Sequence, residues 1–317
     1  MKKVLLIVLS VMLVFALISC EGKGKAAASS GGGGKKVANV LAEYNEWNHV
    51  MEIEMRKLAA EWGWTVENFD SGQSVNEQIN MVNSAVAQGF DFILIQPCDN
   101  AALAPVLEKA VDSGTNVVNF YDYPDSDPVT KKIYQVKFNQ KGTGLMQAEE
   151  YIKMAGTKGK VALIGGLTGA TNAQQREQGY KEIFAKYPDI QIVASVFCDW
   201  DRQKAMAAAE DIISSHPDLT AFLVMDDQMA WGVYEAINAA GKKGKILISS
   251  QGFYESSIPA IKDDIFMFTI TYPPGYFGKA GMELAKQISE GKVPKPPYSV
   301  DVGFSLVTKD NVDTAPF

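Results

Sequence analysis

The sequence predicts an α/β protein made of two doubly wound lobes, each an open parallel sheet flanked by helices. Beyond residue 36, short β-rich runs alternate with amphipathic helical patterns, which is typical of βαβ units. Several runs are almost continuously apolar, as expected of parallel strands buried on both faces. About five strand–helix units precede the polar stretch 138–144, and about five follow it. The repeated layout is why two lobes are expected.

Ten strands are expected, five in each half of the chain. The first five lie at 37–44, 64–70, 90–97, 116–122 and 132–139. The second five lie at 160–166, 190–197, 221–227, 246–252 and 266–273.

Helices are expected between the strands because apolar residues recur there with helical spacing. Steps of three and four mark one buried helix face, and the residues that show them are Met51, Met55, Leu58 and Trp62, then Val75, Ile79, Val82 and Val86, and later Met206, Ala209 and Ile213. Either Ser71 or Ser74 can cap the second of these helices.

The first forty residues predict export and anchoring. Lys2 and Lys3 precede an apolar run from Val4 to Ile18, which is shorter than the roughly 20 residues that a membrane-spanning helix needs. A signal peptide is therefore expected over 1–19. The end of this run resembles the bacterial lipobox, which implies that Cys20 carries lipid.

A flexible tether is expected over residues 20–36, where Gly, Ser, Ala and Lys leave almost nothing to bury. A signal peptide with a chance cysteine is the alternative. We expect a protein of the cell envelope, outside the cytoplasm and held to a membrane, in the periplasm or on the outer face.

Composition excludes several classes of function. The net charge of −7 becomes −9 without Lys2 and Lys3, and no basic patch is evident, so nucleic acid is not an expected partner. Cys98 and Cys198 lie a hundred residues apart, and we expect two separate buried thiols. His49 and His216 lack metal-ligand spacing, and no GxSxG elbow is present. We therefore expect no enzyme activity, no cofactor and no metal.

Polar and aromatic side chains follow most of the predicted strands. In doubly wound sheets, ligands bind beyond the carboxyl ends of the strands. Planar amides and carboxylates suit paired hydroxyls, which both donate and accept, and indole faces suit the C–H face of a sugar ring. The candidate ligand-binding residues are Asn45, Trp47, Asn48, Tyr121, Asp122, Gln174, Arg176, Trp200, Asp226, Gln251 and Tyr272.

Residues 37–308 resemble the type I periplasmic sugar-binding proteins, the ribose- and galactose-binding receptors of ABC transporters. The segments that carry this resemblance are AQQREQGYKEIF (173–184) and DWDRQKAMAAAEDIISSHPDLTAFLVMDDQMAWGVYEAINAAGK (199–242), with a weaker match at SSQGF (249–253). The resemblance implies two Rossmann-like lobes, a three-crossover hinge and a ligand held in the cleft. It places the N-terminal lobe at 37–138 plus 273–300 and the C-terminal lobe at 139–272 plus 301–317, with crossings near Asn139, Tyr272 and Asp301.

The resemblance also assigns the candidate residues to ligand positions of the family. Asn45, Trp47 and Asn48 match the first-strand ligand loop, with Trp47 and Asn48 where ribose binders have two phenylalanines. Tyr121 and Asp122 match a polar pair, Gln174 and Arg176 lie at the sugar-binding arginine, and Trp200 matches the stacking aromatic. Asp226 stands where Asn is usual, Gln251 or Gly252 replaces a common Asp, and Tyr272 replaces Gln or Asn. These departures leave the identity of the sugar open.

Other roles are open for some of these residues. Trp47 and Trp200 could be core residues, Asp226 could only cap a helix, and Asp227 is expected mainly to cap that helix. Arg176 could be a solvated helix charge. The stretch GGLTGA (165–170) lacks the spacing of a phosphate-binding loop and is expected to be a tight turn.

These observations predict a solute-binding lipoprotein that captures a small neutral sugar or polyol and delivers it to an ABC permease. Closure of the lobes would trap the ligand. We expect a monomer whose partners are the sugar, the permease and, through the lipid, the membrane. The alternative is a receptor component that docks on a sensor kinase or chemoreceptor, since the same closed form would serve both roles.

Overall fold

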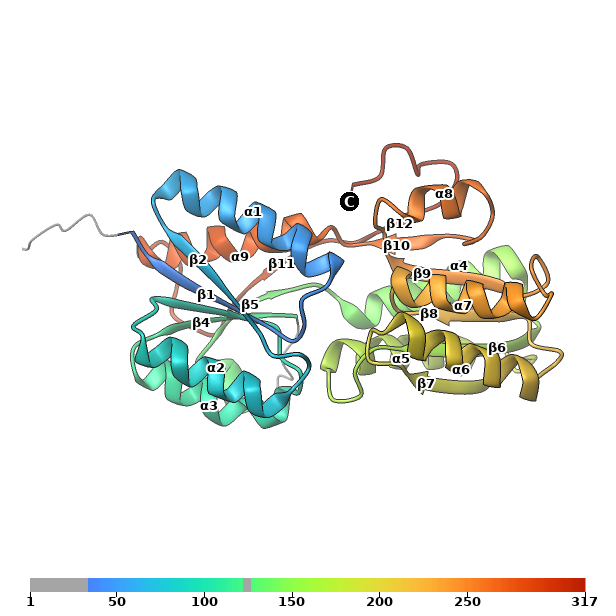
Figure 1. The fold of residues 1–317 in the computed structure, drawn as a ribbon, viewed down its shortest axis with the longest axis horizontal. Helices are drawn as coiled ribbons and strands as arrows, with labels where there is room; N and C mark the ends of the chain where they lie inside the picture. The colour runs from blue at the N-terminus through green and yellow to red at the C-terminus, as the bar shows by residue number, and fades with distance from the viewer. Residues whose placement is uncertain (1–33, 122–126, 317) are drawn as a thin grey trace, which may run out of the picture. The chain divides into compact units, whose positions relative to one another are not determined.

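The computed structural model describes residues 34–121 and 127–316. The elements are β1 (Lys36–Leu41), α1 (Glu46–Trp62), β2 (Thr65–Asp70), α2 (Val75–Ala87), β3 (Phe92–Ile95), α3 (Asn100–Asp112), β4 (Asn116–Phe120), η1 (Pro128–Lys131), β5 (Tyr134–Lys137), α4 (Gln140–Ala155), β6 (Gly159–Gly165), α5 (Thr171–Phe184), β7 (Ile190–Phe197), α6 (Arg202–Ser215), β8 (Ala221–Val224), α7 (Asp227–Ala239), β9 (Leu247–Gly252), α8 (Ser257–Lys262), β10 (Thr269–Thr271), α9 (Pro274–Ser289), β11 (Tyr298–Asp301) and β12 (Ser305–Val307) (Figure 1). The predicted signal peptide, Cys20 and most of the tether lie outside the described residues, and no helix within them has the length and apolar character to cross a bilayer.

The strands form two six-stranded sheets with the same internal order. The first sheet is ordered β11-β5-β4-β3-β1-β2, and the second is ordered β12-β10-β9-β8-β6-β7. When the strands of the second sheet are numbered from β6, the two sheets have the same strand order. Each sheet also has one edge strand, β11 or β12, from the C-terminal part of the chain. The predicted fold class, two doubly wound lobes, is confirmed.

All ten predicted strands are present, whereas the two edge strands β11 and β12 were not predicted. Both are only three or four residues long and only partly buried, so neither gives the apolar run that marks a buried strand. β12 pairs antiparallel with β10, while the other pairs are parallel.

The first sheet is buried on both faces, as its apolar strands predict. Along β1, Val37 and Leu41 pack with α1 and α9, whereas Ala38 and Val40 pack with α2 and α3. This division follows from the alternation of side chains along a strand. In the second sheet, α4 packs with α5 and α6 packs with α7.

The chain passes between the two sheets three times. The passages follow β5, which ends at Lys137, β10, which ends at Thr271, and β11, which ends at Asp301. Asp301 pairs with Lys137 in the first sheet, so the third passage comprises residues 302–304. The three passages agree with the predicted crossover number.

Candidate ligand-binding pocket

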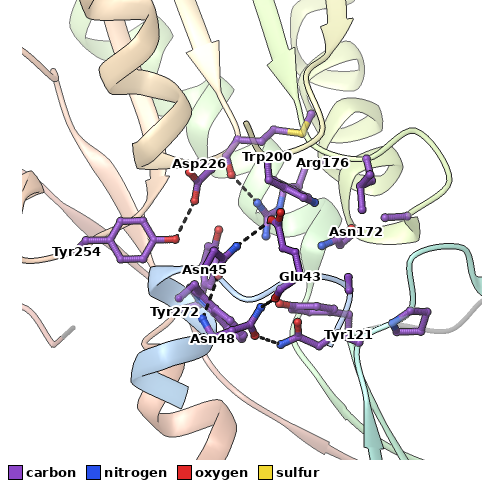
Figure 2. A pocket seen from close by; sticks show the side chains of 17 residues that line it. Glu43, Asn45, Asn48, Tyr121, Asn172, Arg176, Trp200, Asp226, Tyr254 and Tyr272 are labelled. Atoms are coloured by element: carbon purple, nitrogen blue, oxygen red, sulfur yellow. Dashed lines mark hydrogen bonds between the residues drawn. The ribbon is translucent and has the colours of Figure 1, made fainter. Parts of the chain in front are cut away.

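One pocket is lined by residues that follow the carboxyl ends of strands in both sheets. It holds about 590 Å³ of empty space, counting space open to solvent. The central strand pairs, β1 with β3 and β6 with β8, are the points where the strand order reverses, and ligands bind at such points. The lining residues are Ala42, Glu43, Asn45, Trp47, Asn48, Gln96, Pro97, Tyr121, Leu167, Ala170, Asn172, Arg176, Trp200, Met225, Asp226, Tyr254 and Tyr272 (Figure 2).

The loop after β1 is held by its own amide side chains. Asn45 caps α1 by accepting a hydrogen bond from the Asn48 backbone N–H at 3.1 Å, and its Nδ2 donates to the Glu43 carboxylate. Asn48 Nδ2 donates to the Glu43 carbonyl at 2.7 Å, and Asn48 Oδ1 accepts from Gln96. Each of the two amides therefore keeps one free N–H donor, but Asn48 is buried whereas Asn45 is exposed.

Glu43 brings a carboxylate to the pocket that was not predicted. It accepts hydrogen bonds from Gln73 at 2.6 Å and from Asn45 at 2.9 Å. Burial raises the pKa of this carboxyl above its usual range, although the two hydrogen bonds oppose the shift. Spare lone pairs on its oxygens can accept from a ligand hydroxyl.

Trp47 is both a core residue and part of the pocket wall. It is only 6% exposed, and its ring packs against Phe277 at 5.5 Å and Tyr121 at 5.9 Å between centroids. Tyr121 has a left-handed backbone, with φ of 72°, which is uncommon for a bulky residue. Its backbone N–H donates to the Val136 carbonyl.

Arg176 places a buried cation at the pocket. It is 2% exposed, its Nε donates to Gln140 at 2.8 Å, and its Nη1 donates to the Met225 carbonyl at 2.7 Å. Among the described residues no carboxylate forms an ion pair with it. Instead, its guanidinium carbon lies 4.9 Å from the Tyr272 ring and 5.6 Å from the Trp200 ring, within cation–π range. The suggested surface role for Arg176 is therefore wrong.

Asp226 both caps α7 and lines the pocket. Its Oδ1 accepts from the Gln228 and Met229 backbone N–H groups, and its Oδ2 accepts from the Tyr254 hydroxyl at 2.8 Å. Burial, with the neighbouring carboxylate of Asp227, raises the Asp226 pKa to about 7. Figure 2 shows the Tyr254 hydroxyl directed at this carboxylate.

The expectation that Asp227 mainly caps α7 is wrong. Asp227 is fully buried, and its side chain accepts from the Phe253 backbone N–H at 2.8 Å, from Thr269 at 2.9 Å and from Ser257. It therefore ties the segment after β9 to α7, which places Tyr254 at the pocket. The cap is Asp226.

Two of the predicted residues that the structure describes do not line the pocket. Gln174 is exposed, and its Nε2 donates to the Thr168 carbonyl on its own loop. Gln251 is fully buried and donates to Gln147 and Tyr180 within the second lobe. Asp122 lies outside the described residues. The other eight predicted residues all line the pocket.

Sequence reasoning missed Glu43, Gln96, Asn172 and Tyr254. Glu43, Gln96 and Tyr254 lie one or two residues beyond the ends of β1, β3 and β9, so the rule that found the other residues could have found these three. Asn172 lies farther from a strand end, at the start of α5. Phe253, which precedes Tyr254, takes a left-handed φ of 62° that redirects the chain.

The two cysteines of the described part of the chain are free and buried, as predicted. Burial raises the pKa of both thiols, that of Cys198 to about 11, so both are protonated and weakly nucleophilic at neutral pH. Within the described residues, no group of three or more His, Cys, Asp or Glu could hold a metal ion.

A family model described as a periplasmic binding protein domain matches residues 37–293. The chain belongs to this family. The recognition of a type I periplasmic sugar-binding protein from the sequence is thereby confirmed.

This periplasmic binding protein has curated relatives that match most of its length. A D-ribose/D-allose-binding protein from Pseudomonas aeruginosa is 31% identical over 224 residues, which are 69% of this chain and 70% of the relative. The ribose import binding protein RbsB of Bacillus subtilis is 29% identical over 297 residues, 92% of this chain and 95% of the relative. These relatives are solute-binding proteins.

The fold of this binding protein matches solved structures. An ABC transporter solute-binding protein from Burkholderia graminis, in complex with D-arabinose, aligns with a TM-score of 0.83 at 21% identity, over 90% of this chain and 99% of that one. This likeness supports the fold described above.

Proposed function

We propose that this protein captures a small neutral sugar or polyol in the pocket between the strand ends and delivers it to an ABC permease. The observation that carries the proposal is the composition of the pocket. Aromatic rings of Trp200, Tyr121 and Tyr272 stand beside the carboxylates of Glu43 and Asp226 and the guanidinium of Arg176. Rings suit the apolar face of a sugar, and the polar groups suit its hydroxyls.

The charges in the pocket favour a neutral ligand. Among the described lining residues, two carboxylates, Glu43 and Asp226, accompany one cation, Arg176, so a phosphorylated ligand would meet more negative than positive groups. The Arg176 charge is already stabilised by aromatic rings and by hydrogen bonds. One further donor bonds to the Tyr272 side chain, and the others are available to hydroxyl or ring oxygens.

The relatives narrow the choice of first ligands to test. Because two of them are named for D-ribose, and one also for D-allose, both sugars belong in a thermal-shift screen, with xylitol as an open-chain polyol. A ligand at a hundred times its Kd adds about 2.7 kcal/mol to apparent stability. D-ribose 5-phosphate is the matched control and should give no shift. A shift with the phosphate alone, or with none of the four, would count against a neutral sugar.

Closure of the two lobes is part of the proposed function. Hydrogen bonds between residues of the two halves support a closed form: Gln73 donates to the Asp199 carbonyl at 2.7 Å, and Gln228 donates to Glu46 at 2.6 Å. Small-angle scattering should give a smaller radius of gyration with ligand than without. An unchanged radius at saturation would argue that the lobes do not open.

Lipid anchoring at Cys20 is also proposed, on the basis of the apolar run that ends at this residue. Cys20→Ala should release the protein from membranes and leave ligand binding intact, because the tether separates it from the pocket. Cys98→Ala is the matched control and should stay on the membrane. Retention of the Cys20→Ala protein would argue against the anchor.

A further inference from the structure

The two glycines at the end of β6 do not themselves line the pocket. Gly165 ends β6 and Gly166 follows it, and neither lines the pocket. Leu167 and Ala170, a little further along, do line it. The contacts of the Gly166 backbone therefore have to explain why residue 166 is a glycine.

Gly166 lies directly against the indole of Trp200. A Cβ added at residue 166 would lie 2.0 Å from Cζ2, 2.1 Å from Cε2 and 2.3 Å from Cη2 of that ring. Carbon atoms in contact are separated by about 3.5 Å or more. An alanine would therefore have to push the indole away by about 1.5 Å. Only glycine lets the ring rest on the end of β6.

The turn that carries Trp200 is fixed to the same strand end. The Cys198 and Asp199 backbone N–H groups donate to the carbonyls of Gly165 and Gly166 at 2.8 and 3.0 Å. Asp199 and Trp200 both have left-handed backbones, with φ of 54° and 59°, which residues with a Cβ rarely adopt. Because the backbone is held so closely, a displaced indole must move by rotating its side chain.

We propose that Gly166 is a positioning residue that fixes the Trp200 indole against the end of β6 and so sets the room left for the ligand ring. The inference rests on the proposed function. Gly166 does not line the pocket, whereas the indole that rests against it does. A side chain at 166 moves the ring into the space that the ligand needs, and it also alters the contact between the ring and Arg176.

A double-mutant cycle tests this role, with D-ribose and D-allose as probes and titration calorimetry as the measurement. Gly166→Ala should weaken binding at least tenfold when Trp200 is present. In the Trp200→Ala background the same change should weaken binding less than threefold, because no indole remains to be displaced. Equal weakening in both backgrounds, or wild-type affinity of Gly166→Ala, would overturn the proposal.

Gly275→Ala is the matched control. A Cβ there meets only Glu54 Cγ at 3.4 Å, an ordinary contact outside the pocket, so both backgrounds should keep their affinity. If this control also lost affinity, the effect at 166 would not be specific to the indole.

A second measurement needs no sugar. The chain has five tryptophans, so 5-fluorotryptophan labelling should give five fluorine resonances, and the one missing in Trp200→Ala belongs to Trp200. Gly166→Ala should shift that resonance more than the other four, and Gly275→Ala should not. An unmoved resonance would refute the positioning role. If neither sugar binds the wild type, the proposal for these sugars fails, while the resonance still decides the role of Gly166.

Discussion

Trp47 and Trp200 each follow a strand and each line the pocket, one from each lobe, but their surroundings differ. Trp47 is almost fully buried and packs against Phe277 and Tyr121 in the core of the first lobe. Trp200 is partly exposed, rests on a glycine and sits within cation–π range of Arg176. The contrast teaches that the position of an aromatic residue after a strand does not decide its role. Such a residue can pack in the core behind the pocket, or it can contact the ligand.

The largest expected effect separates the two indoles by stability. Trp47→Ala should lower the free energy of unfolding by about 3–5 kcal/mol, the usual cost of emptying a buried aromatic site, as measured by urea denaturation. Trp200→Ala in the same assay serves as the control and should cost much less. Equal losses of unfolding free energy for the two variants would mean that both rings are core residues, and Trp47 and Trp200 would then not differ in role.

A second prediction tests whether Arg176, a pocket residue of the second lobe, makes strong hydrogen bonds to the sugar. Arg176→Lys keeps the charge but loses the planar set of donors. Hydrogen bonds to charged groups are worth about 1.5–3 kcal/mol, so sugar affinity should fall about ten- to a hundredfold. Arg202→Lys is the matched control, since Arg202 pairs with Glu235 at 2.7 Å outside the pocket. Unchanged affinity of Arg176→Lys would show that the charge alone is sufficient.

A third prediction concerns Trp200 as a ligand contact. Stacking contributes about 0.5–1.5 kcal/mol beyond the burial of area, and removing the ring also loses that burial. Trp200→Ala should therefore weaken sugar binding at least roughly tenfold, or about 1.4 kcal/mol. Trp200→Phe should recover part of the loss. A destabilised protein with unchanged affinity per folded molecule would make Trp200 a core residue.

The sequence predicted the sheets well because apolar strands and helical spacing are local signals. β3 and β8 are four-residue buried strands, and their apolar runs are plain in the sequence. β11 lacks such a run because it is a partly exposed edge strand that pairs only with β5. Its pairing depends on a contact between residues more than 150 positions apart, which no local pattern records.

The pocket was predicted in part because strand ends are local, whereas side-chain direction is not. Gln251 belongs to a predicted strand end, yet it turns into the lobe interior toward Gln147 and Tyr180. Tyr254 reaches the pocket because Asp227 anchors the backbone of the preceding residue. These outcomes depend on buried hydrogen bonds between distant segments, so sequence position alone could not decide them.

The smallest expected effect is a pH dependence of folding stability that is caused by Asp226, a pocket residue of the second lobe. Its folded pKa of about 7 lies above the usual value of 3.8 because the carboxyl is buried. Between about pH 4 and 7, the folded state therefore holds a proton that the unfolded state has lost. Stability should fall as pH rises through this window, by on the order of 1–2 kcal/mol for a carboxyl that keeps some exposure, and should change little from this group above pH 7.

Asp226→Asn should flatten that slope, whereas Asp201→Asn, which alters the exposed cap of α6, should keep it; urea denaturation at several pH values measures both. Sugar binding gives the complementary test. A ligand hydroxyl that donates to Asp226 favours the ionised carboxylate, so wild-type affinity should rise from pH 6 to 8, and the rise should vanish in Asp226→Asn. The tyrosine that donates to this carboxylate already favours ionisation, which keeps the effect small. Affinity that falls over the same range would place the hydroxyl donor elsewhere in the pocket and assign Asp226 to the helix cap alone.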